Sequence, residues 1–190
     1  MRLVLASTSP QRRAILEQLQ IPFVTVAPSY VENDPLGVEP ADVVRAHAEG
    51  KARSVHAEGA VTLGVDTGVV LDGSVYGKPE DASAAASMLG ELSGRAHTVH
   101  SGLCLLGPGF EAVHEARTEV RFRKLSADDI ARYVVSDEWR GRAGGYAIQG
   151  LGGRLVERIE GDYLNVVGLP GALLIDVLRR HAPEFLEARS

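Results

Sequence analysis

The 190-residue chain contains little lysine and little cysteine. Only three of its 20 basic residues are lysines, at positions 51, 78 and 124, so arginine occupies nearly every cationic position. A flexible ammonium and a planar guanidinium bind anions differently, and each lysine in such a chain therefore marks a position to follow. The one cysteine, Cys104, permits no internal disulfide, which is typical of a protein in the reducing cytosol.

The chain also lacks the features of membrane proteins and of general nucleic-acid binders. The apolar run within residues 1–6 is too short for a signal peptide, and no segment is long and apolar enough to span a bilayer. A formal net charge of −5 argues against nucleic acid or an anionic membrane as the partner. With 45% hydrophobic and 24% charged residues, the sequence predicts one globular, cytoplasmic domain over residues 1–190.

Strand and helix patterns alternate along the chain, with hairpin signals between them. Asp72-Gly73 separates two short apolar runs and predicts a two-residue hairpin turn. Ser9 followed by Pro10 marks the start of a helix, and residues 126–129, from Ser126 to Asp129, match a capping box at the start of another. The predicted strands cover residues 3–5, 23–26, 61–65, 69–71, 75–76, 98–106, 111–122 and 155–159. The predicted helices begin near residues 10, 40, 81 or 83, 126 and 170. This alternation predicts an α/β fold with a mixed sheet.

The first candidate site is residues 7–13, at the start of the first predicted helix. A helix N-terminus attracts anions because its N–H groups are free and its dipole is positive there. Arg12 and Arg13 in that first turn oppose the dipole unless an anion binds. The segment therefore predicts either a phosphate site or an ordinary capped helix, with one arginine lying over apolar surface.

Asp66 follows the apolar run 61–65, and Thr67-Gly68 predicts that the strand ends and turns there. Ligand crevices of open α/β sheets lie at strand ends, where a carboxylate can bind a divalent metal or activate water. Glu32, in an irregular acidic segment, is a candidate second metal ligand. The alternatives are a turn-forming aspartate at position 66 and a plain turn at residues 33–35 beside Glu32.

Two of the three lysines lie near these candidates in the sequence. Lys51 falls late in the second predicted helix, where the dipole favours cations, and a solvated surface lysine is the simpler interpretation from spacing alone. Lys78 lies in a turn between Gly77 and Pro79, which either aims the side chain or leaves it on the surface. Lys124 is predicted to lie on a solvated face.

Residues 143–150 are too rich in glycine for a regular element, yet they carry Gln149. Glycines permit close approach of the backbone to a ligand, and an amide offers both a donor and an acceptor, as reading a base edge requires. The segment lacks the spacing of a P-loop or a dinucleotide fingerprint. The six histidines show no metal-ligand spacing, no Gly-x-Ser-x-Gly motif is present, and Cys104 lies in an apolar run. The sequence therefore predicts neither a zinc site nor covalent catalysis.

Taken in order, these segments resemble those of the Maf family of nucleoside triphosphate pyrophosphatases. The resemblance covers nearly the whole chain, and the order and spacing of its motifs are highly specific although each motif alone is weak. It rests on residues 3–13, 51–52, 65–67, 77–79, 88–89, 92–95, 97, 118–122, 143–150, 156–163 and 165–170.

The resemblance implies hydrolysis between the α and β phosphates of a nucleoside triphosphate, with release of a nucleoside monophosphate and pyrophosphate. Asp66 matches the family's catalytic acid, taken as the general base for the attacking water. Glu32 matches an acidic position near the metal, so Glu32 and Asp66 are the expected ligands of a divalent cation such as Mg²⁺, Mn²⁺ or Co²⁺. The implied fold is similar to that of the inosine-triphosphate pyrophosphatases: an elongated mixed sheet with flanking helices and two lobes around a central cleft. A homodimer is expected at the level of the family alone.

The same resemblance assigns the remaining roles. Lys51 and Lys78 join Asp66 as the expected catalytic group, because transfer at phosphorus needs charge neutralisation and an oriented water more than covalent chemistry. The residues expected to bind the nucleotide are Ser7, Ser9, Gln11, Arg12, Arg13, Thr67 and Gln149.

Three positions bear on which base is recognised. Thr67 and Gln149 match the branch of the family that acts on dTTP and UTP, whereas Gln11 stands where that branch typically has arginine. Residues 139–142 and Gly68 also depart from the family pattern. We therefore expect a house-cleaning pyrophosphatase for dTTP, UTP and modified pyrimidine nucleotides. The alternatives are 7-methyl-GTP or purine nucleotides as substrates, and a non-enzymatic nucleotide-binding regulator of cell division.

Overall fold

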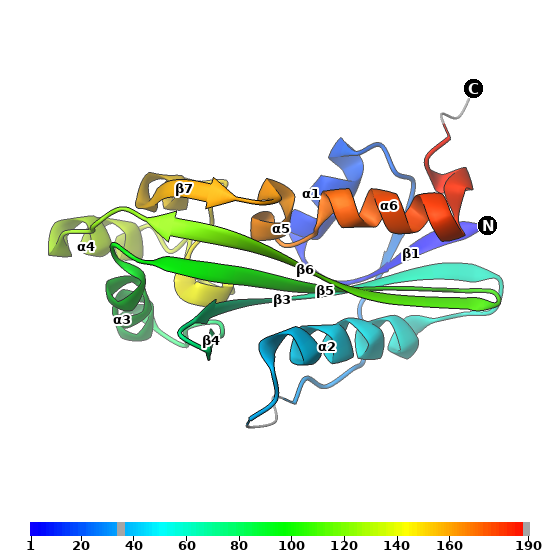
Figure 1. The fold of residues 1–190 in the computed structure, drawn as a ribbon, viewed down its shortest axis with the longest axis horizontal. Helices are drawn as coiled ribbons and strands as arrows, with labels where there is room; N and C mark the ends of the chain where they lie inside the picture. The colour runs from blue at the N-terminus through cyan, green and yellow to red at the C-terminus, as the bar shows by residue number, and fades with distance from the viewer. Residues whose placement is uncertain (34–36, 188–190) are drawn as a thin grey trace. The chain divides into compact units, whose positions relative to one another are not determined.

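The computed structural model describes residues 1–33 and 37–187, over which seven strands form one sheet (Figure 1). The strands are β1 (Arg2–Ala6), β2 (Val24–Val26), β3 (Ala60–Leu71), β4 (Ser74–Tyr76), β5 (Ala96–Gly107), β6 (Phe110–Phe122) and β7 (Val156–Glu160). The α-helices are α1 (Pro10–Gln18), α2 (Pro40–Val55), α3 (Ala82–Leu92), α4 (Ala127–Val135), α5 (Tyr163–Val167) and α6 (Gly171–His181). Short 3₁₀ helices are η1 (Ala143–Gly145), η2 (Leu151–Leu155) and η3 (Pro183–Phe185).

The sheet is mixed, as the sequence predicts. Its order is β2-β1-β3-β5-β6-β7, with β4 paired to β3. β1 is parallel to both β2 and β3, with Leu5 opposite Leu63 in the second pair. β3 and β4 are antiparallel, and so are β6 and β7. The strands and the helices between them confirm the predicted α/β class.

The described chain divides into two compact units. The first contains the described residues of 1–66, 101–116 and 168–187, and the second contains residues 67–100 and 117–167. β3, β5 and β6 each contribute residues to both units. The central cleft and the single domain expected from the sequence stay predictions.

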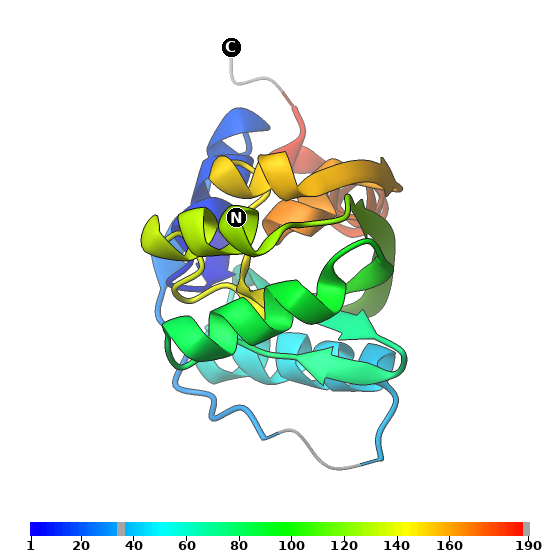
Figure 2. The same cartoon turned by 90° about the vertical axis from the view of Figure 1, so that its left-hand side faces the viewer.

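In the first unit, helices cover both faces of the sheet. Figure 1 shows α2 on one face and α1 and α6 on the other, and Figure 2 shows the same arrangement after a quarter turn. β1 buries four consecutive residues, 3–6, as expected for a strand covered on both faces. α1 buries Ile15 and Leu16, and α6 buries Leu174, Val177 and Leu178.

Two glycines set the distance of α2 from the sheet. A Cβ atom on Gly64 of β3 would overlap the carbonyl oxygen of Ala48 and lie 2.8 Å from the backbone nitrogen of Ala52. A Cβ atom on Gly102 of β5 would overlap the carbonyl group of Val44. The α2 backbone therefore lies directly on β3 and β5 at positions where the strands have no side chain.

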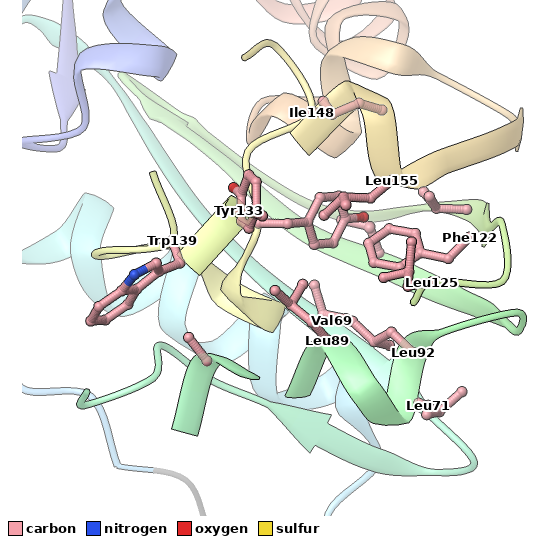
Figure 3. Packing of buried hydrophobic residues seen from close by; sticks show 14 residues of the cluster. Val69, Leu71, Leu89, Leu92, Phe122, Leu125, Tyr133, Trp139, Ile148 and Leu155 are labelled. Carbon is pink, nitrogen blue, oxygen red and sulfur yellow. The ribbon is translucent and has the colours of Figure 1, made fainter. Parts of the chain in front are cut away.

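The second unit has its own core, formed by side chains from β3, α3, β6, α4 and the segments that follow α4 (Figure 3). Phe122 and Trp139 are among the largest fully buried side chains of the described chain. Val69, Leu89 and Leu92 belong to the same cluster. α3 packs against α4, and both views show the two helices next to each other.

The turns and helix starts predicted from local sequence signals are present in the structure. Asp72 and Gly73 both have positive φ, 50° and 78°, which is the geometry of the tight turn expected between β3 and β4. Asp81 caps α3 by accepting a hydrogen bond from the Ala84 nitrogen. Ser126 and Asp129 form the predicted capping box at the start of α4.

The prediction that the third strand ends at Asp66 is wrong. β3 continues through Asp66, Thr67 and Gly68 to Leu71 and turns only after it. Its last three residues pair with β4, and β5 lies beside it as the next strand of the sheet. β3 is therefore extended through Thr67-Gly68, where the local sequence resembles a turn.

Over the described residues, the α-helices range from the five-residue α5 to the 16-residue α2. α5 is not predicted by the sequence pattern, because a single turn carries too few apolar positions to show a period.

Among the described residues, no helix combines the length and the apolar character needed to cross a membrane.

Cys104 lies in β5 and is fully buried. Burial, assisted by the nearby carboxylates of Glu111 and Glu49, raises the pKa of its thiol to about 12. A thiol that stays protonated at neutral pH is a poor nucleophile.

Candidate functional site

Residues 7–12 form a compact hydrogen-bonded start to α1. The Ser9 side chain caps the helix by accepting from the Arg12 nitrogen at 3.4 Å, and its hydroxyl donates to Gln11 Oε1 at 3.2 Å. The Ser9 nitrogen donates to Ser7 Oγ at 3.1 Å. Pro10 occupies the first turn, which carries no acidic residue to offset the positive end of the dipole. Ser7, Ser9 and Gln11 are therefore brought together, and their part in nucleotide binding stays a prediction.

The guanidinium of Arg12 is fixed on the same side of α1. Its Nε donates to the carbonyl oxygen of Gly168 at 2.9 Å, and its Nη1 donates to Ser7 Oγ at 3.3 Å. Burial lowers the pKa of Arg12, while the carboxylates of Asp66 and Glu32 act in the opposite direction. Arg12 thus lies within electrostatic reach of both predicted metal ligands and remains a cation at neutral pH.

Lys51 lies between two carboxylates. Its Nζ is 2.6 Å from Glu32 Oε1 and 2.5 Å from Asp66 Oδ1. The residue is only 7% exposed, so the solvated surface lysine suggested by spacing alone is wrong. An ammonium buried in this way needs a negative partner, and here two carboxylates share it.

The close packing of α2 on β3 brings Lys51 to Asp66. Gly64 and Asp66 are two residues apart and project from the same face of β3, the face that α2 covers. Ala48, whose carbonyl lies over Gly64, is one helical turn before Lys51. Asp66 is therefore placed beside the next turn of α2, with its side chain 15% exposed.

The side chain of Arg13 does not point in the same direction as that of Arg12. Its side chain is exposed and lines a shallow hollow with Glu17 and residues 22–25. Consecutive residues of a helix point about 100° apart, so Arg12 and Arg13 do not share a face. The part of Arg13 in nucleotide binding stays a prediction.

Thr67, Lys78 and Gln149 belong to the second unit. Lys78 is exposed in the turn between β4 and α3, and Gln149 is exposed near the end of the glycine-rich segment. The Gly144 nitrogen donates to the carbonyl oxygen of Gly77 at 3.1 Å, so these two segments are joined. That their side chains meet the same nucleotide as Lys51 stays a prediction.

The glycine-rich segment is anchored by buried rings. Gly144 has φ 69°, and a Cβ atom there would lie 2.9 Å from a methyl carbon of Val69. The hydroxyl of Tyr146 and Nε2 of His97 are 2.8 Å apart, and both residues are buried. The segment that carries Gln149 is therefore a fixed structure despite its lack of regular elements.

A family model described as Maf-like protein matches residues 2–181 of the chain. The chain belongs to the Maf family. It is 49% identical over 174 residues to a protein of Moorella thermoacetica named dTTP/UTP pyrophosphatase, with 89% of each chain covered. A protein of Symbiobacterium thermophilum with the same name is 47% identical over 171 residues, covering 89% of this chain and 88% of its own.

A solved structure of a HAM1 protein from Coxiella burnetii resembles the fold of this Maf-family chain. The TM-score is 0.53 with 16% identity, and the match covers 95% of this chain and 99% of that one. At this identity the likeness concerns the fold alone.

Glu32 and Asp66 of the Maf-family chain fit a divalent metal whose other ligands are waters and phosphate oxygens. Both carboxylates contact one ammonium, so they lie close enough to share one cation. In phosphate sites Mg²⁺ binds one or two carboxylates together with waters and phosphate oxygens. Among the described residues, no group of three His, Cys, Asp or Glu side chains could hold a metal ion alone.

Three features of the site escape the sequence patterns. The Gly168 carbonyl that holds Arg12 has no side-chain signature, although Gly168 has a positive φ of 129°. The buried pair of His97 and Tyr146 shows no spacing motif. The third is the packing of the Tyr30 ring against α2, and Gly50 inside that helix is the signal that could have indicated it, since a glycine in a helix interior usually has a packing reason.

The burial of His97 predicts that the free energy of unfolding of this Maf-family chain falls in acid. Burial lowers the pKa of His97 to about 4 from an ordinary value of 6.5, so the unfolded chain takes up the proton first as the pH falls. The neutral imidazole stabilises the fold fully above about pH 6.5, and we expect roughly 3 kcal/mol to be lost as the pH falls from there to about 4. Urea unfolding at a series of pH values measures this loss.

His97→Gln is the comparison variant, because an amide can hydrogen-bond to Tyr146 without titrating. Its unfolding free energy should fall less steeply with acid between pH 6.5 and 4. Asp129, whose pKa is lowered chiefly by the hydrogen bond from Arg123, loses its contribution below that window. Parallel curves for the variant and the native chain would contradict the assignment to His97.

Proposed function

We propose that this chain hydrolyses nucleoside triphosphates, in particular dTTP and UTP, to the nucleoside monophosphate and pyrophosphate in the cytoplasm. The observation that carries the proposal is the pairing of Lys51 with Glu32 and Asp66 within electrostatic reach of Arg12. The shared name of the relatives, dTTP/UTP pyrophosphatase, supports the substrate class.

Asp66 is assigned the role of general base. Lys51 holds Oδ1 at 2.5 Å and thereby fixes the plane of the carboxylate, and Oδ2 is the atom that we assign to the attacking water. The water oxygen bonds to the α-phosphorus. The bond from the α-phosphorus to the oxygen that bridges it to the β-phosphorus breaks, and pyrophosphate leaves. The proton of the water passes to Asp66.

Fixed cations assist this step by neutralising charge on the phosphates. Arg12 is held by hydrogen bonds at Nε and Nη1, so its guanidinium need not reorganise when the triphosphate arrives. Lys51 contacts Glu32 and Asp66, the two carboxylates that also act on Arg12, and Lys78 is assigned to the same task. Ser7, Ser9, Gln11 and Arg13 are assigned to the phosphates, and Thr67 and Gln149 to the base.

The charge balance of the site gives a reason for a metal. Arg12 and Lys51 carry two positive charges, and Glu32 and Asp66 carry two negative ones, so this group is neutral before a nucleotide binds. A triphosphate adds several negative charges that the group does not offset. A divalent metal bound at Glu32 and Asp66 would supply that charge and polarise the phosphate oxygens.

A nucleotide panel tests the proposal. Purified protein with Mg²⁺ or Mn²⁺ is incubated with dTTP, UTP, CTP, GTP and 7-methyl-GTP, and monophosphate and pyrophosphate are quantified. We expect the highest kcat/KM for dTTP and UTP, with equal amounts of the two products. Hydrolysis of 7-methyl-GTP alone would overturn the base assignment, and release of orthophosphate would overturn the assigned bond.

A further inference from the structure

Tyr30 packs against α2 next to the ion pairs of Lys51. Its hydroxyl lies 3.0 Å from Nδ1 of His47, and the two ring centroids are 5.6 Å apart at an angle of 60°. His47 is 3% exposed and belongs to the buried face of α2. Tyr30 is thereby attached to the helix that carries Lys51.

Gly50 makes room for the ring. A Cβ atom on Gly50 would overlap Cε2 and lie 2.5 Å from Cδ2 and 2.6 Å from Cζ of Tyr30. Since Gly50 directly precedes Lys51 and lies one turn after His47, the tyrosine ring covers the turn of α2 from which Lys51 extends. Any side chain at position 50 would push the ring off the helix.

Among the described residues, the segment that carries Glu32 has no regular secondary structure. β2 ends at Val26, and residues 27–33 belong to no helix or strand. Glu32 nevertheless places Oε1 2.6 Å from Lys51 Nζ, although its side chain is 46% exposed. Holding an irregular segment in one conformation costs backbone entropy. Attachment of the segment at Tyr30 leaves less of this cost for placing Glu32, two residues later, against Lys51.

We propose that Tyr30 is a positioning residue: its ring, seated on Gly50 and hydrogen-bonded to His47, holds Glu32 against Lys51. The role in catalysis rests on the proposed function, in which Glu32 contributes to the charge of the phosphate site. In this role Tyr30 acts through Glu32 and not through contact with the substrate.

A double-mutant cycle on kcat/KM tests the proposal. We expect Tyr30→Ala to lower kcat/KM about tenfold, close to the loss caused by Glu32→Gln. Residues that orient a metal-binding side chain typically contribute factors of about 10–100 to metal affinity or activity. In the Glu32→Gln background, Tyr30→Ala should change kcat/KM by less than about twofold. Tyr30→Phe keeps the ring on Gly50 and should recover activity to within about threefold of the native chain.

Gly50→Ala tests the same arrangement without altering Tyr30. The methyl group displaces the ring, so we expect the same tenfold loss. Gly90→Ala in α3 is the matched control, since a Cβ atom there has nothing within 4 Å. Its activity should equal that of the native chain. Full activity of Tyr30→Ala, or an equal loss from Tyr30→Ala with and without Glu32, would overturn the proposal.

Amide hydrogen exchange separates this proposal from the proposed function. Exchange of residues 27–33 should be faster in Tyr30→Ala and in Gly50→Ala than in the native chain, while exchange in α6 stays unchanged. This readout needs no substrate, so it decides the attachment even if no nucleotide in the panel is hydrolysed. Unchanged exchange in both variants would overturn the positioning role.

Discussion

Replacing Asp66 with asparagine should lower turnover of dTTP by about 10²- to 10⁴-fold, the range typical of losing a general base. Asparagine keeps an oxygen that can accept from Lys51, so the fold and the position of the lysine should change little. The amide cannot take the proton of the attacking water. Pyrophosphate release under saturating nucleotide measures the loss, and isothermal titration should show a dissociation constant within a few fold of that of the native chain.

Asp42→Asn is the matched control for this variant. Asp42 is an exposed carboxylate in the first turn of α2, where it pairs with Arg45. Its replacement should leave turnover unchanged. Turnover of Asp66→Asn near that of the native chain would remove Asp66 from the mechanism. Tight nucleotide binding by a native chain that hydrolyses nothing would instead indicate a regulator that binds nucleotide without turning it over.

Gly64→Ala should impair both stability and activity. The added methyl overlaps the carbonyl oxygen of Ala48, and backbone atoms cannot rotate away as a side chain can. We expect the free energy of unfolding to fall by about 2–3 kcal/mol, as for other overpacked cores. α2 must shift to relieve the overlap, and the displaced Lys51 should lower kcat by about 10- to 100-fold.

Gly102→Ala separates the two effects. It pushes on α2 in the same way at Val44, two turns before Lys51. Urea unfolding should show a similar loss of stability, whereas kcat should fall much less than in Gly64→Ala. Equal losses of kcat in both variants would mean that activity follows stability and not the position of Lys51.

Signals that act within a few residues predicted local structure correctly. The cap at Ser9, the turn at Asp72-Gly73 and the capping box at Ser126 need only backbone geometry and a short side chain. Their physical cause lies inside the segment that forms them. The mixed sheet follows from the sum of such elements.

Features that depend on distant partners could not be predicted in the same way. Thr67-Gly68 has the composition of a turn, but both residues belong to the 12-residue β3, which lies in the sheet beside β5, a strand far along the chain. Lys51 at a helix end suggests a solvated cation, and its burial depends on Gly64 and on two carboxylates in separate segments. Family motifs indicated that Lys51 matters, whereas only the fold shows what it contacts.

The buried cysteine makes the chain suitable for site-specific fluorescent labelling. Burial raises the pKa of the Cys104 thiol to about 12, so the thiol stays protonated at neutral pH. The fold also covers it, and a maleimide dye should therefore not react with it. Val31, between Tyr30 and Glu32, is 82% exposed. A dye on Val31→Cys would therefore be the single reporter on the chain, and it would follow nucleotide binding in the Asp66→Asn protein, where product formation gives no signal.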